Sequence, residues 1–529
     1  MEPDAEVRAM EPDPHAEGPA ISLSSQRGWW VVGVTVLGSA VAMLEATVVN
    51  VALPAIGRDL GAGVAGLQWT LNGYLLTLAA LILLGGSLGD RYGRRRVFEL
   101  GIAWFTAASL LCALAPNVEV LVAARVLQGI GGALLTPGSL AIIEAVIRPQ
   151  DRARAIGAWS ALGGVAAAIG PLLGGYLVGA LSWRAIFFIN VPLAAFGIWA
   201  CRRHVPETRD PTVGGRLDLR GSLLAAVGLG GITFALIQAD GGSPLALALA
   251  VVGLVAVVGF VAAERRSPDP MLPLEIFASR QFTGANLVTF VVYAALGGVF
   301  FLLVVFLQVA LGYSPIAAGA ASLPITALLL LLSARAGALA QRIGPRVPLT
   351  VGPLLIAAGM LLMRRIQIGD GYVETVLPAV LVFGVGLAGV VAPVTATVLA
   401  AADPRHAGVA SGVNNAVART AQLVAVAALP LVVGLSGDAY RNPQAMASAF
   451  HAAMLVTAAL AAAGGLLAWA TIRSDVLERA REPDRAACQE ALDLVPERHC
   501  AVAGTPMVME AARRDGAPAR AQSAEVAAG

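Results

Sequence analysis

Residues 85–96 read GGSLGDRYGRRR, and this short stretch separates two long apolar runs at 67–88 and 97–115. Each run has about the length of a membrane-crossing helix, for which about 20 apolar residues are needed. Arginine is costly in hydrocarbon, and short loops rich in arginine are retained on the cytoplasmic side. The stretch therefore predicts a cytoplasmic turn between two membrane helices, with its positive charge carried by Arg91, Arg94, Arg95 and Arg96.

A weaker copy of this turn lies 251 residues further along the chain. A single polar loop of this kind arises easily by chance, but two copies with matched spacing indicate an internal duplication. Two helical halves with the same cytoplasmic turn are typical of secondary transporters, in which one half rocks against the other around a central site. Asp90 of the first copy corresponds to Gln341. The matching positions are Gly86, Leu88, Arg91, Gly93 and Arg95 in the first copy and Gly337, Leu339, Arg342, Gly344 and Arg346 in the second.

The composition excludes an ordinary soluble protein. The chain has 529 residues, of which 57% are hydrophobic and 13% are charged, so it is expected to be a polytopic membrane protein. A net charge of +2 gives no reason to expect a nucleic-acid partner. The first 27 residues are acidic and lack the basic region of a signal peptide, which predicts a cytoplasmic amino terminus. Four scattered cysteines match no zinc site, so no metal is expected.

The apolar runs predict an all-α membrane protein with fourteen spans. An even number of spans places both termini on one side. The loops that should be cytoplasmic hold 18 arginines and the opposite loops hold 5, which supports this orientation in a cytoplasmic membrane. The predicted spans are 29–52, 67–88, 97–115, 119–141, 157–180, 185–201, 221–239, 244–263, 284–307, 316–336, 347–363, 374–396, 410–434 and 447–470.

The spans group as six plus two plus six, because the seventh and eighth lie outside the duplicated units. We expect two pseudo-symmetric six-helix bundles. The predicted segments are an acidic cytoplasmic tail at 1–28, the first bundle at 29–201, a cytoplasmic linker at 202–220, two extra membrane helices at 221–263, a cytoplasmic loop at 264–283, the second bundle at 284–470 and a cytoplasmic tail at 471–529.

Glu45 is an acidic residue inside the first span, and ionisable groups at such depth mark function by default. Arg125 in the fourth span is a candidate partner. Glu45 lies about 24 Å from the cytoplasmic end of its helix, and Arg125 lies about 9 Å from the opposite end of its own helix, so their depths nearly coincide in a core about 30 Å thick. We favour a proton-exchanging role for this pair. The alternative is a static ion pair that only fixes helix packing.

Glycines and polar side chains mark further candidate sites within the spans. Glycines allow helices to approach closely, and proline invites a kink. In the fifth span this applies to Gly157, Gly170, Pro171, Gly174 and Gly175. Polar side chains inside spans either line a cavity or join neighbouring helices, and the candidates to line a cavity are Asn50, Asn72, Gln128, Gln308 and Arg419. No nucleophile with a nearby base is evident, so an enzyme is not expected.

Several stretches in order resemble the fourteen-span drug:proton antiporter branch of the major facilitator superfamily, over about residues 29–470. The resemblance implies the major facilitator fold. Residues 86–95 are similar to the family's cytoplasmic loop motif, which places Gly86, Asp90, Arg91, Gly93, Arg94 and Arg95 in gating positions. Leu121, Arg125, Gln128, Gly129, Gly131 and Gly132 match the fourth-span motif, whose arginine is associated with proton coupling. The fifth-span glycines and Pro171 match the antiporter motif. WRAIFFINVP at 183–192 and QVALGYSPIAAGAASLP at 308–324 are also typical of the branch.

Three positions depart from the pattern of this branch. Glu45 stands where Asp is usual, Ala166 where Gly is usual in the antiporter motif, and Gln422 where a Gly is expected in the thirteenth span. The first change keeps a carboxylate and extends its reach by one methylene. The second predicts a looser approach of helices at Ala166.

The expected function is proton-coupled export of hydrophobic or cationic drugs and antibiotics by alternating access. No phosphate-binding loop of the nucleotide-hydrolysing type is present, so a proton gradient is the expected driving force and no cofactor is expected. The partners are then a small-molecule substrate, protons and the lipid bilayer, and a monomer suffices. One alternative is a dedicated exporter of a single metabolite or antibiotic. A more remote one is a non-transporting membrane sensor.

Overall fold

The computed structural model describes residues 21–210, 217–239, 243–403 and 407–479. Within these residues the regular structure is helical, apart from one isolated bridge between Ile21 and Ile147. Fourteen helical segments in this part of the chain are long and apolar enough to cross a membrane, as predicted. Most of the two predicted tails lies outside the described residues.

The first eight spans are formed by nine helices, because the sixth span is interrupted at Ile189. Asn117 caps α4 by accepting a hydrogen bond from the backbone N–H of Val120. Pro149 and Pro244 occupy the first turns of their helices, where the missing N–H costs nothing. The helices are α1 (Gln26–Asp59), α2 (Val64–Tyr92), α3 (Arg94–Ala113), α4 (Val118–Val146), α5 (Pro149–Ala180), α6 (Ala185–Phe188), α7 (Asn190–His204), α8 (Leu219–Ile237) and α9 (Pro244–Arg266).

The last six spans follow a short 3-10 segment, η2 (Leu274–Ala278). The tenth span is divided at Ser322, and the twelfth begins with a π-helical turn, η3 (Tyr372–Val376). Asn442 caps α16 by accepting from the N–H groups of Gln444 and Ala445. The helices are α10 (Arg280–Val309), α11 (Pro315–Ala321), α12 (Leu323–Ile343), α13 (Arg346–Met363), α14 (Leu377–Ala400), α15 (Ala407–Val432) and α16 (Pro443–Thr471). A short 3-10 segment, η5 (Ala439–Arg441), precedes α16, and the short helix α17 (Val476–Arg479) follows it.

Most of the extensive helix packing lies within the two predicted bundles. In the first bundle α4 packs against α2 and α3, and α1 packs against α5. In the second bundle α13 packs against α14 and α16, and α10 packs against α15 and α16. The two bundles meet where α2 contacts α15, α5 contacts α11 and α1 contacts α10. Any central site must therefore be lined by these helices.

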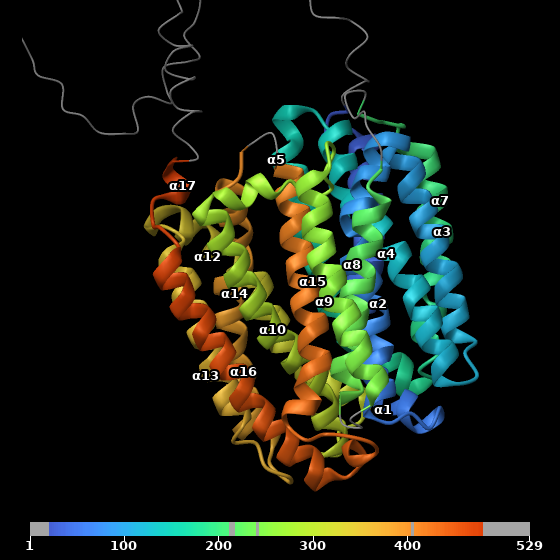
Figure 1. The fold of residues 1–529 in the computed structure, drawn as a ribbon, viewed down its shortest axis with the longest axis vertical. Helices are drawn as coiled ribbons and strands as arrows, with labels where there is room; N and C mark the ends of the chain where they lie inside the picture. Colours follow the sequence, from blue (N-terminus) through green and yellow to red (C-terminus); the bar gives the residue numbers. More distant parts are fainter. Residues whose placement is uncertain (1–20, 211–216, 240–242, 404–406, 480–529) are drawn as a thin grey trace, which may run out of the picture. The chain divides into compact units, whose positions relative to one another are not determined.

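The two extra helices form a pair at the junction of the bundles. α8 packs against α9 and also contacts α2 and α15, one helix from each bundle (Figure 1). α9 contributes little to the core, since Leu247 and Val258 are 70% and 69% exposed. A helix that exposes such apolar side chains belongs against lipid.

The arginine-rich turn is much shorter than the sequence predicts. α2 continues to Tyr92 and α3 begins at Arg94, so within 85–96 only Gly93 lies outside a helix. The prediction of a longer turn was wrong because α2 has 29 residues, or about 44 Å, and extends beyond a hydrocarbon core of about 30 Å. Asp90 and Arg91 are therefore helical residues at the end of α2.

The second copy of the turn has the same backbone geometry as the first. Gly93 has φ +112° and Gly344 has φ +83°, a region that favours glycine. Each glycine is covered by the segment that follows the sixth membrane span of its bundle, which ends with α7 in the first bundle and is α16 in the second. A side chain at Gly93 would meet Glu207, and one at Gly344 would meet Ser474. We call the end of the molecule that carries both glycines the arginine-rich end. This match supports the internal duplication.

Candidate functional site

Glu45 and Arg125 form an ion pair inside the first bundle, as their predicted depths require. The Arg125 guanidinium donates to Glu45 Oε1 at 2.5 Å. The Arg125 side chain is 1% exposed and the Glu45 side chain is 2% exposed. The pair joins the middle of α1 to α4. A buried pair of this kind is costly to desolvate, and removing one partner strands the other charge.

The guanidinium of Arg125 is held by further groups from α2 and α4. Its Nε donates to the backbone carbonyl of Thr70 at 2.9 Å, and the guanidinium also donates to Gln128 Oε1. The Tyr74 ring lies beneath it, with 4.6 Å between the guanidinium carbon and the ring centroid. A cation over an aromatic face is stabilised by the ring quadrupole. Arg125 thus keeps several partners that do not depend on Glu45.

The carboxylate of Glu45 has its own second partner. Asn190 of α7 donates to Glu45 Oε2 at 3.1 Å and to Ser109 Oγ of α3 at 3.2 Å. Gln128 closes the ring by donating to Ser109 Oγ at 2.8 Å. Asn190 and Ser109 were not singled out from the sequence as site residues, although Asn190 lies in the WRAIFFINVP stretch. Polar side chains in otherwise apolar spans were the available signal.

A cavity of about 290 Å³ lies between the bundles and reaches this network. Arg125 and Tyr74 form part of its wall on the first bundle, and Arg419 and Gln422 of α15 form part of its wall on the second. Aromatic and aliphatic side chains dominate the remaining surface, including Phe300, Phe301, Leu71, Val304, Ile325 and Leu387. An apolar cavity with a few polar groups is the usual form of a small-molecule site.

The five predicted cavity residues occupy different surroundings. Asn50 and Arg419 line this cavity, whereas Asn72, Gln128 and Gln308 are not among its lining residues. Gln128 belongs to the Glu45–Arg125 network instead. The Gln308 side chain of α10 donates to the carbonyl of Val51 on α1 at 2.9 Å and so joins the two bundles. Asn72 is fully buried within α2.

The fifth-span motif brings helices together both within and between bundles. Gly170 and Gly174 face Thr47 and Val48 of α1, so that a side chain at either position would collide with α1. Gly175 packs against the backbone of Pro315 on α11. A side chain built at Gly157 would meet no heavy atom within 4 Å, so this residue is not part of a close approach.

The α5–α11 contact lies at the end of the molecule away from the arginine-rich end, and Pro171 strengthens it. The carbonyl of Pro171 packs on Gly319 of α11, where a side chain would not fit. Hydrogen bonds join the bundles at the same end. Gln68 of α2 donates to the carbonyls of Val426 and Ala427 on α15 at 2.8 and 2.9 Å. The bundles are thus in tight contact at this end.

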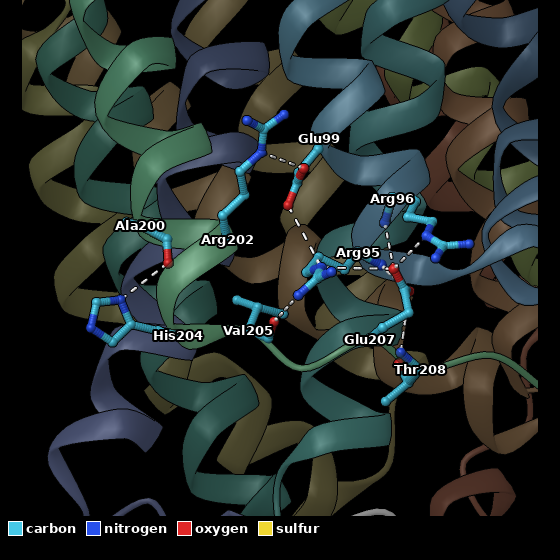
Figure 2. Close-up of polar contacts among 9 residues, drawn as sticks. All are labelled: Arg95, Arg96, Glu99, Ala200, Arg202, His204, Val205, Glu207 and Thr208. Atoms are coloured by element: carbon cyan, nitrogen blue, oxygen red, sulfur yellow. Dashed lines mark hydrogen bonds and ion pairs between the residues drawn. The ribbon is translucent and has the colours of Figure 1, made fainter.

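Near the arginine-rich end, the predicted gating residue Arg95 and its neighbour Arg96 bind the segment that follows α7 (Figure 2). The carboxylate of Glu207 accepts from the backbone N–H groups of Arg95 and Arg96, at 3.1 and 3.2 Å. These are otherwise unpaired donors at the start of α3. Glu207 also lies 3.7 and 3.6 Å from the side chains of the same two arginines. A linker residue therefore caps the helix that follows the turn.

Two other residues that the sequence predicts for gating, Asp90 and Arg94, add to this attachment. Asp90 forms an ion pair with Arg94 at 2.7 Å, one helical turn away across Gly93. The backbone carbonyl of Asp90 accepts from the N–H of Asp210 at 2.9 Å, and the N–H of Arg94 donates to the carbonyl of Thr208 at 2.8 Å. Arg91 lies with its guanidinium carbon 5.8 Å from the centroid of the Tyr92 ring. The linker and the turn thus form one hydrogen-bonded unit.

Known proteins with similar sequences are resistance and export proteins. The Puromycin resistance protein pur8 of Streptomyces alboniger is 37% identical over 436 residues, which cover 80% of this chain and 86% of that protein. The Tetracenomycin C resistance and export protein of Streptomyces glaucescens is 33% identical over 443 residues, which cover 83% of this chain and 82% of that protein. These likenesses span both predicted bundles.

Solved structures support the same fold. A bacterial homologue of the human lysosomal transporter Spinster, solved in an inward-facing and unoccupied conformation, matches with a TM-score of 0.61 at 18% identity. The match covers 86% of this chain and 99% of that protein. A sequence model of one protein family, described as the Major Facilitator Superfamily, matches residues 35–426 of this chain. The chain is therefore a membrane transporter, not an enzyme, and belongs to the Major Facilitator Superfamily.

Proposed function

We propose that this transporter exports hydrophobic or cationic drugs and antibiotics from the cell in exchange for protons. The observation that carries the proposal is the buried Glu45–Arg125 ion pair, whose arginine also forms part of the cavity wall. A change of charge at Glu45 therefore changes the electrostatic potential in the cavity where a substrate would bind. The names of the relatives support efflux, since they are resistance and export proteins.

Protonation of Glu45 is the coupling step in this proposal. A proton on the carboxylate removes its attraction for Arg125, and the guanidinium keeps Gln128, the Thr70 carbonyl and the Tyr74 ring as partners. Leaving a buried charge without its partner costs about 3–5 kcal/mol; protonation removes this cost for the carboxylate, and the hydrogen bonds and the ring offset part of it for Arg125. An entering proton contributes about 2.3 kcal/mol per 100 mV of membrane potential, so the exchange can drive uphill export.

Alternating access follows from the contacts between the bundles. The α5–α11 contact and the Gln68 hydrogen bonds close the end away from the arginine-rich end. We propose that the arginine-rich end and both termini face the cytoplasm, because the arginine bias has that sign. The present state is then closed toward the outside. In this proposal the turn between α2 and α3 gates the movement of the first bundle. The residues that fix the geometry of this turn are Gly86, Asp90, Arg91, Gly93, Arg94 and Arg95.

The test is dye uptake into inverted membrane vesicles with an imposed acidic interior. We expect the native chain to accumulate members of a panel of cationic, neutral and anionic lipophilic dyes, and Glu45→Gln to lose most of this uptake. Glu119→Gln is the matched control, because Glu119 is exposed in the first turn of α4. Uptake that is the same in native and Glu45→Gln vesicles would exclude the proton role of Glu45.

A dedicated exporter of one metabolite or antibiotic is the second candidate function. The relatives favour it to the extent that their names specify a single compound, puromycin in one case and tetracenomycin C in the other. It predicts that no member of the dye panel moves. Neither proposal requires a cofactor or a second subunit.

A further inference from the structure

The charge of the central cavity bears on which substrates it accepts. Arg125 and Arg419 are the charged side chains among its lining residues, and no acidic side chain is among them. Arg125 is neutralised by Glu45. Arg419 is half-buried, and among the described residues its polar partner is the uncharged side chain of Gln422, at 3.2 Å. With Glu45 ionised, the cavity therefore carries one positive charge that no acidic side chain among its described lining residues balances.

None of the acidic residues that the structure describes in the second bundle lines the cavity beside Arg419. Between 280 and 471 the acidic residues are Asp370, Glu374, Asp403 and Asp438, and among the described residues only Glu374 lies within a membrane helix. Glu374 lies in the π-helical turn at the start of its span, on the far end from the arginine-rich end, and it does not line the cavity. An unbalanced charge at membrane depth is costly, so such residues mark sites for a ligand of opposite charge.

Arg419 is also fixed in position, as a binding group must be. Gln422, one helical turn away on α15, accepts a hydrogen bond from the guanidinium. α15 approaches α10 closely here, since a side chain built at Gly297 would lie 2.9 Å from the Cα of Gln422. Gln422 is the position at which this chain departs from the glycine typical of its branch. The departure thus places a second polar group beside the arginine.

We infer that the cavity binds hydrophobic organic acids, with the carboxylate or other anionic group of the substrate on Arg419 and its apolar body against Phe300 and Phe301. Guanidinium groups pair with carboxylates through two parallel hydrogen bonds, which gives this contact direction as well as charge. A cationic substrate would instead be repelled. Arg419 lies on α15, so an anion can bind there without breaking the Glu45–Arg125 pair in the other bundle.

This inference rests on the proposed export function and changes its substrate class from hydrophobic or cationic drugs to hydrophobic anions, and one experiment separates the two. Fluorescein and rhodamine 123 share a tricyclic aromatic scaffold and carry opposite charge near neutral pH. Uptake of both dyes is measured in inverted vesicles with an acidic interior. The proteins are the native chain, Arg419→Gln, Arg419→Lys and the control Arg335→Gln, whose arginine is exposed on α12 and bonded only to its own helix among the described residues.

We expect the native chain to accumulate fluorescein in preference to rhodamine 123. Arg419→Gln should lower fluorescein uptake tenfold or more without lowering rhodamine 123 uptake. Arg419→Lys should restore part of the fluorescein uptake, because lysine keeps the charge but not the paired hydrogen bonds, and Arg335→Gln should match the native chain. Uptake of rhodamine 123 with none of fluorescein, or an equal loss of both dyes in Arg419→Gln at native expression and melting temperature, overturns the inference and leaves export standing. If neither dye moves in any protein, the broad export function falls and the inference falls with it.

Discussion

Replacement of Glu207 by Ala tests whether the linker after α7 holds the start of α3. The change removes the acceptor for the N–H groups of Arg95 and Arg96, together with two ion pairs at 3.6 and 3.7 Å. Loss of a helix cap typically costs about 0.5–2 kcal/mol. The two partly exposed ion pairs add at most about 1 kcal/mol. The expected local loss is about 0.5–3 kcal/mol.

Amide hydrogen exchange measures this loss at the residues concerned. A loss of about 0.5–3 kcal/mol corresponds to about a 2- to 150-fold faster exchange, expected for the amides of Arg95 and Arg96. Glu275→Ala is a suitable control, because Glu275 is an exposed acidic residue in a different segment, the loop at 264–283 that is predicted to be cytoplasmic. Unchanged exchange at 95 and 96 in Glu207→Ala would refute the capping role of Glu207.

Three further changes have expected outcomes. Gly175→Val should separate α5 from α11, seen as a longer distance between spin labels at Leu181 and Ala317, whereas Gly157→Val has open space and should leave that distance unchanged. Arg125→Met should destabilise the fold by about 3–5 kcal/mol in denaturant or thermal unfolding, because it strands Glu45, and adding Glu45→Gln should recover part of the loss; equal stability of native and Arg125→Met would contradict this. Glu264→Gln should raise stability by about 1 kcal/mol, because Glu264 Oε1 and Asp218 Oδ2 both lie beside Gly221, both are buried without a donor among the described residues, and glutamine supplies one. A lower melting temperature would argue against it.

The spans and the central ion pair were predictable because they depend on distances along single helices. Apolar length fixes a membrane crossing, and equal depth brings Glu45 and Arg125 together. The extent of the turn at Gly93 was not predictable in the same way, because helices continue past the hydrocarbon into the headgroup region. The cap supplied by Glu207 depends on how the linker folds back over the turn, which no local pattern specifies.

The direction in which a polar side chain points was also beyond the sequence. Asn50 and Asn72 are both single amides in apolar spans, yet only Asn50 lines the cavity. Gln128 lies one turn from Arg125 on α4, and its amide binds that arginine. These differences arise from the rotation of each helix about its axis. Close packing sets that rotation, for example where Gly85 of α2 meets the backbone of Ala133 on α4.

Substrate movement by purified protein in liposomes, with and without a proton gradient, tests the central claim most directly. With no gradient, exchange of labelled for unlabelled substrate requires alternating access alone. We expect Glu45→Gln to retain this exchange and to lose accumulation of substrate driven by a pH gradient, whereas the native chain performs both. If Glu45→Gln still concentrates substrate against its gradient when protons flow, the Glu45–Arg125 pair does not couple transport to protons.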